Sequence, residues 1–416
     1  MRLLLKKIKQ LATPVGNKLK KGSQMSDIKI MEDVDVYIEN GKFREIGKNL
    51  AGKIENTHEN PLEEMDCENL VATPGIVDPH THIPFAGERH REFYLRQQGK
   101  TYIEILNEGG GIINTTKAVR NSSEDEMMRQ NLEYAMEMFS KGVVVFEGKS
   151  GYGLDTESEI KQLKVLYEME KLLPQKIVKT FLGPHALAPE FDDYDTYMNF
   201  INDKMLPIVY EEFGEDIFVD VFCEKGVFGV EQSRKYLEKA KEFGFKLKMH
   251  ADEIEYLGGS VLGAEMGAKS VDHLIAIEQD GIEALSSSDT VAVMLPGTSF
   301  FLGKPFAPAR KLIDSGAAVA LASDFNPGSC TFNDPHFVAH LASAKLGMSP
   351  EEILTAQTLN AAAALDIAQD WGSIEIGKNC GMILWDISDY RFVPYFPGHN
   401  IINTVVSPYL EGEHEV

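Results

Sequence analysis

Short apolar runs recur along the middle of the chain and predict β-strands, and the stretches between them have the spacing of amphipathic helices. Residues 123–141, 157–173, 231–243 and 260–266 are expected to be crossover helices. Alternating strands and helices are typical of parallel β/α units, and eight of them make a (β/α)8 barrel. The eight expected strands are residues 75–82, 142–149, 177–185, 217–224, 246–253, 270–274, 290–296 and 317–324.

The two ends of the chain have a different pattern. Residues 1–70 and 375–416 carry short alternating segments, with a hairpin signal at Asn40-Gly41. The basic first residues are not followed by a long apolar region and a cleavage site, so we expect a first strand there rather than a targeting segment. The sequence therefore predicts an α/β protein with a TIM-like catalytic barrel over residues 71–374. Both chain ends, 1–70 and 375–416, are expected to build one small β-sandwich domain.

Composition is consistent with one large enzyme domain. The chain has 416 residues, of which 43% are hydrophobic and 25% charged, enough for a substantial core. The net charge of -23 disfavours nucleic acid or an anionic membrane surface as a partner, and no apolar run reaches membrane-spanning length. The cysteines lack a C-x-x-C spacing, which favours reduced thiols in the cytoplasm over a disulfide framework. They are Cys67, Cys223, Cys330 and Cys380.

Several expected strands end in side chains that bind transition metals. His80 and His82 are two residues apart, so an extended strand would point both imidazoles to one side. A His-x-His pair alone is more often incidental. However, His250 and Asp324 end two further runs, and a barrel brings the carboxyl ends of its strands to one face. Three imidazoles and one carboxylate with room for water are the pattern of an open catalytic metal site.

The motifs around these residues resemble the imidazolonepropionase family, within the amidohydrolase superfamily. The segments at 149–154 and 326–329 are more particular to that family, whereas the first and last motifs occur broadly in amidohydrolases. The resemblance implies hydrolysis of 4-imidazolone-5-propanoate to N-formimidoyl-L-glutamate, a step of histidine degradation, by a homodimer. The motifs span nearly the whole chain, in the expected order, at residues 73–82, 149–154, 181–186, 220–228, 250–253, 271–274 and 323–329.

This chemistry requires an activated water and a proton carrier. A metal on the four ligands can lower the pKa of its water to about 7. Glu253, three residues after His250, is placed to take the proton of that water and return it to the leaving ring nitrogen. His273 can stabilise the oxyanion, contact the water or serve as a further ligand, and the sequence leaves these roles open. Zinc is the first choice of metal, although ferrous or ferric iron also suits nitrogen and oxygen ligands.

The small anionic substrate calls for a second set of residues. Arg89, on the loop after the His80-x-His82 pair, offers a planar fork for the propanoate carboxylate. The family resemblance adds further contacts with substrate or product. These expected contacts are Tyr102, Tyr152, His185, Glu253, Asn326, Gly328 and Ser329.

Other functions share part of this pattern. A guanine- or cytosine-type deaminase would use the same metal ligands and Glu253, but a neutral nucleobase needs no arginine such as Arg89. A metal-binding barrel without turnover is disfavoured by Glu253 beside an open ligand set. A binuclear site of the dihydroorotase kind needs a bridging carboxylated lysine at the end of the fourth strand, which instead ends in Glu224. We therefore expect one metal ion.

Overall fold

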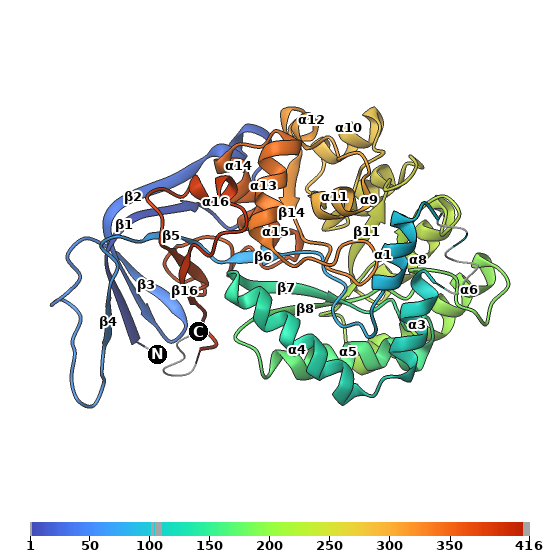
Figure 1. Ribbon diagram of the computed structural model, residues 1–416, viewed down its shortest axis with the longest axis horizontal. Helices are drawn as coiled ribbons and strands as arrows, with labels where there is room; N and C mark the ends of the chain where they lie inside the picture. The colour runs from blue at the N-terminus through green and yellow to red at the C-terminus, as the bar shows by residue number, and fades with distance from the viewer. Residues whose placement is uncertain (1, 101–103, 105–109, 411–416) are drawn as a thin grey trace.

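The protein consists of a parallel barrel and, beside it, a sheet formed by both ends of the chain (Figure 1). The structure is a computed structural model and describes residues 2–100, 104 and 110–410. The terminal sheet lies at the left of Figure 1, and the barrel with its helices occupies the rest. This arrangement confirms the predicted α/β fold class.

The barrel contains all eight expected strands, ordered around it as they are in the sequence. Neighbouring strands pair in parallel. The fourth expected run is divided at Asp220, whose carboxylate accepts from the backbone N–H groups of Val221 and His250 at 2.7 and 3.2 Å. The strands are β6 Ile76–Asp78, β7 Val143–Lys149, β8 Lys176–Phe181, β9 Phe218–Val219 with β10 Phe222–Cys223, β11 Lys246–Ala251, β12 Ser270–His273, β13 Val291–Met294 and β14 Ala318–Leu321.

Two backbone hydrogen bonds join the first and last strands just beyond their ends. The N–H of Asp324 donates to the carbonyl of His80 at 3.0 Å, and the N–H of His82 donates to the carbonyl of Phe325 at 2.9 Å. These bonds nearly close the barrel. They also place the two histidines of the His-x-His pair beside Asp324, which is 242 positions or more away along the chain.

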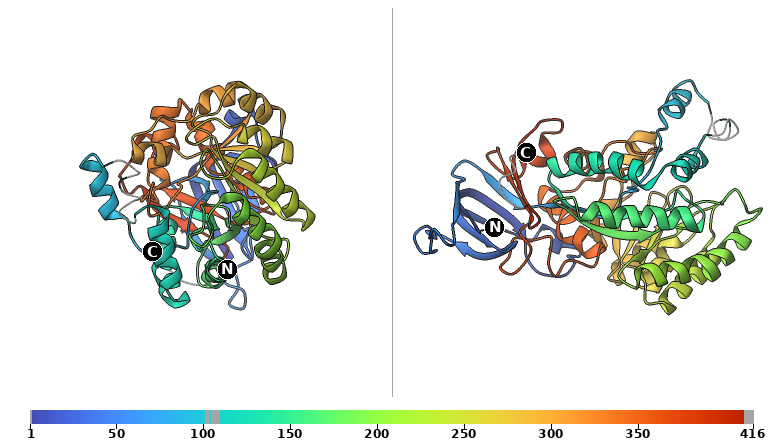
Figure 2. Two further views of the ribbon diagram at one scale, coloured as in Figure 1. Left: turned by 90° about the vertical axis from the view of Figure 1, so that its right-hand side faces the viewer. Right: turned by 90° about the horizontal axis from the view of Figure 1, so that it is seen from below.

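Helices surround the barrel, as the left view of Figure 2 shows. The four expected crossover helices are confirmed as α4, α5, α8 and α9. Helix α4 begins after Ser123, which forms a capping box with Glu126, and α9 ends at Gly267 in the left-handed conformation. The helices are α1 His90–Gln97, α3 Ile112–Asn121, α4 Glu124–Ser140, α5 Thr156–Glu170, α6 Tyr194–Phe200, α7 Leu206–Phe213, α8 Val230–Glu242, α9 Gly259–Met266, α10 Gln279–Ser287, α11 Pro296–Leu302, α12 Ala309–Asp314, α13 Pro335–Leu346, α14 Pro350–Gln357, α15 Leu359–Ala364 and α16 Phe392–Tyr395, with short helices η1 Gly22–Ser26 and η2 Ile201–Met205.

The terminal sheet draws strands from both chain ends, as predicted. Its order is β16-β15-β5-β1-β2-β3, with β4 also paired to β1. The strands of this small domain are joined by one path of hydrogen bonds, because the long β1 pairs with β4 before a bulge between Leu5 and Ile8 and with β5 after it. The strands are β1 Arg2–Pro14, β2 Ile28–Glu39, β3 Lys42–Gly47, β4 Glu63–Asp66, β5 Val71–Pro74, β15 Met382–Trp385 and β16 Ile402–Val406.

Two local predictions for this sheet are also confirmed. The first residues form a strand, and a tight hairpin joins β2 to β3. Asn40 and Gly41 at its turn both have positive φ, 51° and 69°, as a two-residue hairpin turn of the primed type requires. The chain passes from β5 through Gly75 into the first barrel strand.

The four cysteines are free and buried, as expected from their spacing. Over residues 2–100, 104 and 110–410, no helix has the length and apolar character needed to cross a membrane.

Candidate active site

The predicted metal ligands meet at the C-terminal ends of the barrel strands. His80 Nε2 lies 3.3 Å from His82 Nε2, and Asp324 Oδ1 lies 3.5 Å from the first and 3.3 Å from the second. The His250 ring is next to them, with its centroid 4.5 Å from that of His80. All four residues are buried. The barrel therefore brings together four side chains from three distant parts of the sequence.

The ligand atoms are suited to a transition metal. Asp324 Oδ1 and His250 Nε2 are buried and have no hydrogen-bond partner among the described residues. Burial is the main reason that the pKa values of His82 and His250 fall to about 3, so both rings are neutral and can donate a lone pair near pH 7. Neutral imidazoles with one carboxylate are the donor set that zinc and iron accept. The residues present thus fit the expected metal.

Buried carboxylates hold two of the imidazoles in place. His80 Nδ1 lies 2.6 Å from Asp272 Oδ2, and His250 Nδ1 lies 3.0 Å from Asp220 Oδ2. A proton on each Nδ1 leaves each Nε2 with a free lone pair on the ligand side. The hydroxyl of Thr298 donates to the second oxygen of Asp324. These supporting residues were not among those predicted from the sequence.

A fully buried ionic network lies beneath these carboxylates. The Lys149 ammonium lies 2.8 Å from both Glu147 and Asp220. The Lys248 ammonium lies 2.8 Å from Glu147 and 3.6 Å from Asp272. All five side chains are 0% exposed.

The sequence contained a signal for this network. Lys248 is two residues before His250 in one strand, so both side chains point into the barrel. Glu147 and Lys149 have the same spacing in β7. Charged residues at alternate positions of otherwise apolar strands therefore indicate the lining of the barrel beneath the site.

The two predicted catalytic residues lie together at the rim. Glu253 Oε2 is 3.7 Å from His273 Nε2, and the Glu253 side chain is 18% exposed. Burial, followed by the negative charges of Asp324 and Glu224, raises the pKa of Glu253 to about 8. His273 has a φ of 80°, in the left-handed region, where a non-glycine residue is strained. His273 also lies close enough to His80 and His250 to complete a second group of three candidate ligands.

Arg89 is placed near the site but is already paired. Its Nε and Nη2 both lie 2.9 Å from Glu92 Oε2. Its Nη1 faces Gly328, where a side chain as small as one Cβ atom would come within 2.0 Å of it. Burial raises the pKa of Tyr152, and the positive charge of Arg89 opposes this shift in part. Two of the three guanidinium nitrogens of Arg89 are thus held by Glu92, and the third lies against Gly328.

A second arginine reaches the same place and was not predicted. Arg96 Nη2 donates to the carbonyl of Gly328 at 3.2 Å, and its guanidinium lies over the rings of Phe93 and Phe301. A cavity of about 350 Å³ adjoins Arg89 and Arg96 at this point. Helix α1, which carries Arg96, is therefore linked to the loop after β14.

Tyr152 and His185 form a wall beside the His80–His82 pair. The His185 ring stacks on His82 with 5.1 Å between centroids, and the Tyr152 ring is 5.7 Å from His82 and 5.3 Å from His185. His185 Nδ1 lies 2.8 Å from the carbonyl of Gly151. The substrate-binding role of both residues stays a prediction.

Asn326 and Ser329 shape the loop after β14. Asn326 Oδ1 accepts from the N–H groups of Gly328 and Ser329 at 2.9 and 2.8 Å and from the Ser329 hydroxyl at 3.0 Å. Asn326 Nδ2 donates to the carbonyl of Asp324. Their contacts with substrate stay a prediction. Tyr102, the remaining predicted contact, lies outside the described residues.

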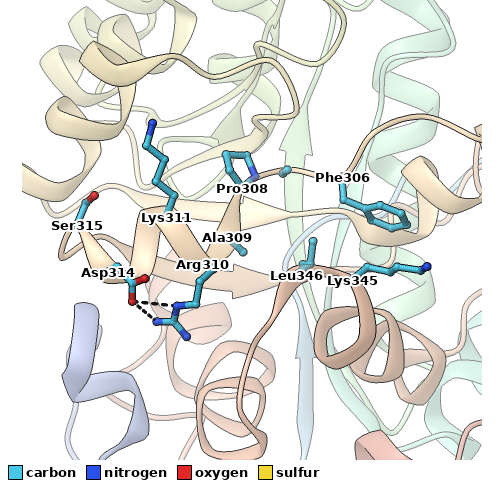
Figure 3. Close-up of a pocket in the computed structure, with 10 residues that line it drawn as sticks. Phe306, Pro308, Ala309, Arg310, Lys311, Asp314, Ser315, Lys345 and Leu346 are labelled. Atoms are coloured by element: carbon cyan, nitrogen blue, oxygen red, sulfur yellow. Dashed lines mark hydrogen bonds and ion pairs between the residues drawn. The ribbon is translucent and has the colours of Figure 1, made fainter.

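Another hollow lies on the outer surface, between α12 and α13 (Figure 3). Arg310 in this hollow pairs with Asp314 at 2.8 Å, while Lys311 and Lys345 extend away from that pair. None of the described ligand or substrate-binding candidates lines it. The candidate site at the barrel mouth is therefore separate from this hollow.

Comparisons with known proteins agree with this geometry. Residues 71–409 match the model of the amidohydrolase family. Curated proteins called imidazolonepropionase are similar over nearly the full length. The one from Kosmotoga olearia is 44% identical over 393 residues, 94% of each chain. The one from Clostridium tetani is 44% identical over 405 residues, 97% of this chain and 96% of the relative.

Solved structures share the fold at much lower identity. A triazine hydrolase variant matches with a TM-score of 0.73 and 15% identity, covering 98% of this chain and 94% of the other. An adenosine deaminase from Xanthomonas campestris, solved with bound zinc, matches with a TM-score of 0.73 and 14% identity, covering 98% and 92%. At these identities the likeness shows the barrel with its appended sheet and no more.

Proposed function

Since the chain belongs to the imidazolonepropionase family of the amidohydrolases, we propose that it hydrolyses the cyclic amide of 4-imidazolone-5-propanoate to N-formimidoyl-L-glutamate, a step of histidine degradation. The observation that supports this most directly is the cluster of His80, His82, His250 and Asp324 with Glu253 at its rim. A buried ligand set beside a carboxylate is what metal-dependent hydrolysis needs.

One transition metal ion per chain would be held by His80, His82, His250 and Asp324, with zinc as the first choice and iron as the second. When bound, such an ion supplies Lewis acidity, which makes a water molecule acidic enough to deprotonate near neutral pH. Asp272 and Asp220 would keep the ligand imidazoles in the tautomer with a free Nε2.

Glu253 is the proposed proton carrier. Its carboxylate accepts the proton of the attacking water and then delivers it to the ring nitrogen that leaves as the amide bond breaks. Its raised pKa, about 8, suits a group that must both accept and release a proton near neutral pH. His273, 3.7 Å from Glu253, would donate a hydrogen bond to the carbonyl oxygen as negative charge develops there.

Arg89 is proposed to bind the propanoate carboxylate with the fork positions that Glu92 leaves free. Tyr152 and His185 would pack along the imidazolone ring, and the loop with Asn326, Gly328 and Ser329 would close the carboxylate end. Tyr102 is proposed for the same pocket on family resemblance alone. This set gives a specific reason to prefer an anionic substrate over a neutral nucleobase.

The family resemblance also supports two proposals about the cellular form of the protein. We propose a homodimer in the cytoplasm, with no nucleic-acid or membrane partner. The net charge of -23 is consistent with the second part because it repels anionic polymers and surfaces.

The deciding experiment is to incubate metal-loaded protein with freshly made 4-imidazolone-5-propanoate. Loss of substrate ultraviolet absorbance and formation of N-formimidoyl-L-glutamate are expected. Guanine and cytosine serve as control substrates for the deaminase alternative. Ammonia release from either nucleobase, with no consumption of the imidazolone, would contradict the proposed function.

A further inference from the structure

The loop that carries Tyr152 is bound from behind by a buried glutamate. This loop, residues 150–154, connects β7 to α5. The carboxylate of Glu159, in the first turn and a half of α5, accepts from the backbone N–H of Gly151 and from that of Leu154, each at 2.8 Å. One side chain therefore accepts hydrogen bonds from backbone N–H groups on both sides of Tyr152.

Gln162 accepts hydrogen bonds from the two N–H groups between those of Gly151 and Leu154. Its Oε1 accepts from the N–H of Tyr152 at 3.2 Å and from that of Gly153 at 3.0 Å. Its Nε2 donates to the carbonyl of Pro84 at 2.7 Å, in the segment that follows the His-x-His pair. Four consecutive backbone N–H groups are thus bound by two side chains of one helix.

The two side chains are placed for this task by the helix itself. Glu159 and Gln162 are three residues apart, so they lie on one face of α5, and both are 0% exposed. Buried backbone N–H groups require hydrogen-bond partners. Gly151 has a φ of 115°, so the loop is not an extended strand that could pair its N–H groups with a neighbouring strand. The conformation of the loop therefore depends on these two acceptors.

The same loop also fixes the second aromatic residue of the wall. The carbonyl of Gly151 lies 2.8 Å from His185 Nδ1, and the Tyr197 hydroxyl lies 2.9 Å from the carbonyl of Leu154 and 3.2 Å from that of Gly183, so it can donate to either. A shift of the loop would consequently move His185 together with Tyr152.

We propose that Glu159 and Gln162 are positioning residues that set where Tyr152 and His185 stand against the substrate. The inference rests on the proposed function, in which these two rings contact the imidazolone. Glu159 and Gln162 act through the backbone of the loop and do not reach the substrate themselves.

Two variants test the proposal. Glu159→Gln keeps the size of the side chain but replaces one acceptor oxygen by an NH₂ group, which cannot accept a hydrogen bond. Gln162→Met removes both the acceptor and the donor. If Glu159→Gln does not fold, Gln162→Met alone tests the proposal. Each should raise KM for 4-imidazolone-5-propanoate about tenfold or more, since misplacement of a binding group by about 1 Å can cost up to 10²-fold. Metal content should stay at the parent level.

The chain provides matched controls at the opposite end of the barrel. Glu170, at the end of the same helix, accepts from the N–H of Ile177 at 2.9 Å. Gln175, also buried, donates to the carbonyl of Val143 at 2.8 Å. Glu170→Gln, which also removes the charge that faces Lys179, and Gln175→Met disturb hydrogen bonds far from the wall, and their KM should stay within about twofold of the parent. An equal rise of KM in the controls would overturn the proposal, because it would reflect general loosening of the barrel.

A double-mutant cycle with Tyr152→Ala identifies the route of the effect. If Glu159 acts through the loop, Glu159→Gln should change KM less in the Tyr152→Ala background than in the parent, since coupled residues are not additive. Full additivity would overturn the proposal. A parent protein that does not hydrolyse the imidazolone would overturn the proposed function and this inference with it, whereas parent turnover with unchanged KM in both variants overturns this inference alone.

Discussion

A Cβ atom on Gly328 would lie 2.0 Å from Nη1 of Arg89 and 2.6 Å from its Cζ, so the arginine and the glycine are packed without room for one methyl group. The guanidinium cannot simply swing away, because Glu92 binds it through Nε and Nη2. Only glycine at this position lets the loop after β14 approach the proposed carboxylate-binding group.

Gly328→Ala should therefore move the Arg89 guanidinium and weaken substrate binding. We expect KM to rise about 10–100-fold, because the shift displaces the carboxylate partner by roughly the size of a methyl group. Steady-state kinetics on the imidazolone measure this. Gly47→Ala is the control, since a Cβ there meets only Leu50 at 3.7 Å and φ is not positive. Equal KM values in both variants would show that Arg89 can move without consequence.

Arg89→Ala tests the charge itself. It should cost about 2–5 kcal/mol in transition-state binding, because the propanoate would lose its partner in a partly desolvated pocket. Arg89→Lys should recover only part of this, since an ammonium lacks the planar fork. Comparison of kcat/KM for the imidazolone with and without its propanoate arm isolates the effect. A variant that handles both compounds as the parent does would contradict the assignment.

The proposed metal should be needed for activity more than for folding. Its ligands lie at the ends of barrel strands, and Asp272, Asp220 and Thr298, which belong to the same barrel, contact three of them. Chelation should therefore abolish turnover while circular dichroism changes little, and zinc or iron should restore it. Elemental analysis should find close to one transition metal per chain. Two tightly bound ions, both required, would contradict the mononuclear site.

The ionic network should contribute to stability. Lys248→Met leaves Glu147 and Asp272 buried beside too little positive charge, so we expect a loss of about 3–5 kcal/mol in the free energy of unfolding. Lys248→Met with Glu147→Gln removes one charge of each sign and should recover part of that loss. Urea denaturation measures both. A double variant less stable than the single one would show that charge balance is not what the network provides.

Much of this site could be predicted from the sequence because its ligands sit at strand ends. Apolar runs identified the strands, and the barrel geometry then placed His250 and Asp324 beside the His-x-His pair. The supporting contacts were not predictable in the same way. Asp272 meets His80 across 192 residues, and nothing local in either strand specifies that pairing.

The acceptors behind the Tyr152 loop show a second limit. Glu159 follows a helix cap and has the spacing of an ordinary first-turn residue, so the sequence favours a solvated glutamate there. Its burial results from the loop folding back over α5, where a Cβ on Gly153 would lie 2.6 Å from the backbone of Glu159.

Glu253→Gln separates proton transfer from metal binding. The amide keeps the size of the side chain and can still form hydrogen bonds, but it cannot take a proton from water. Turnover should fall by roughly 10²–10⁴-fold. Bound metal should persist, because Glu253 lies beside His273 rather than among the four proposed ligands. Glu255→Gln, two residues further along and exposed in its pair with Lys225, is the matched control and should keep parent turnover. Normal turnover in Glu253→Gln would refute its role, and loss of metal in that variant would instead make Glu253 part of the metal site.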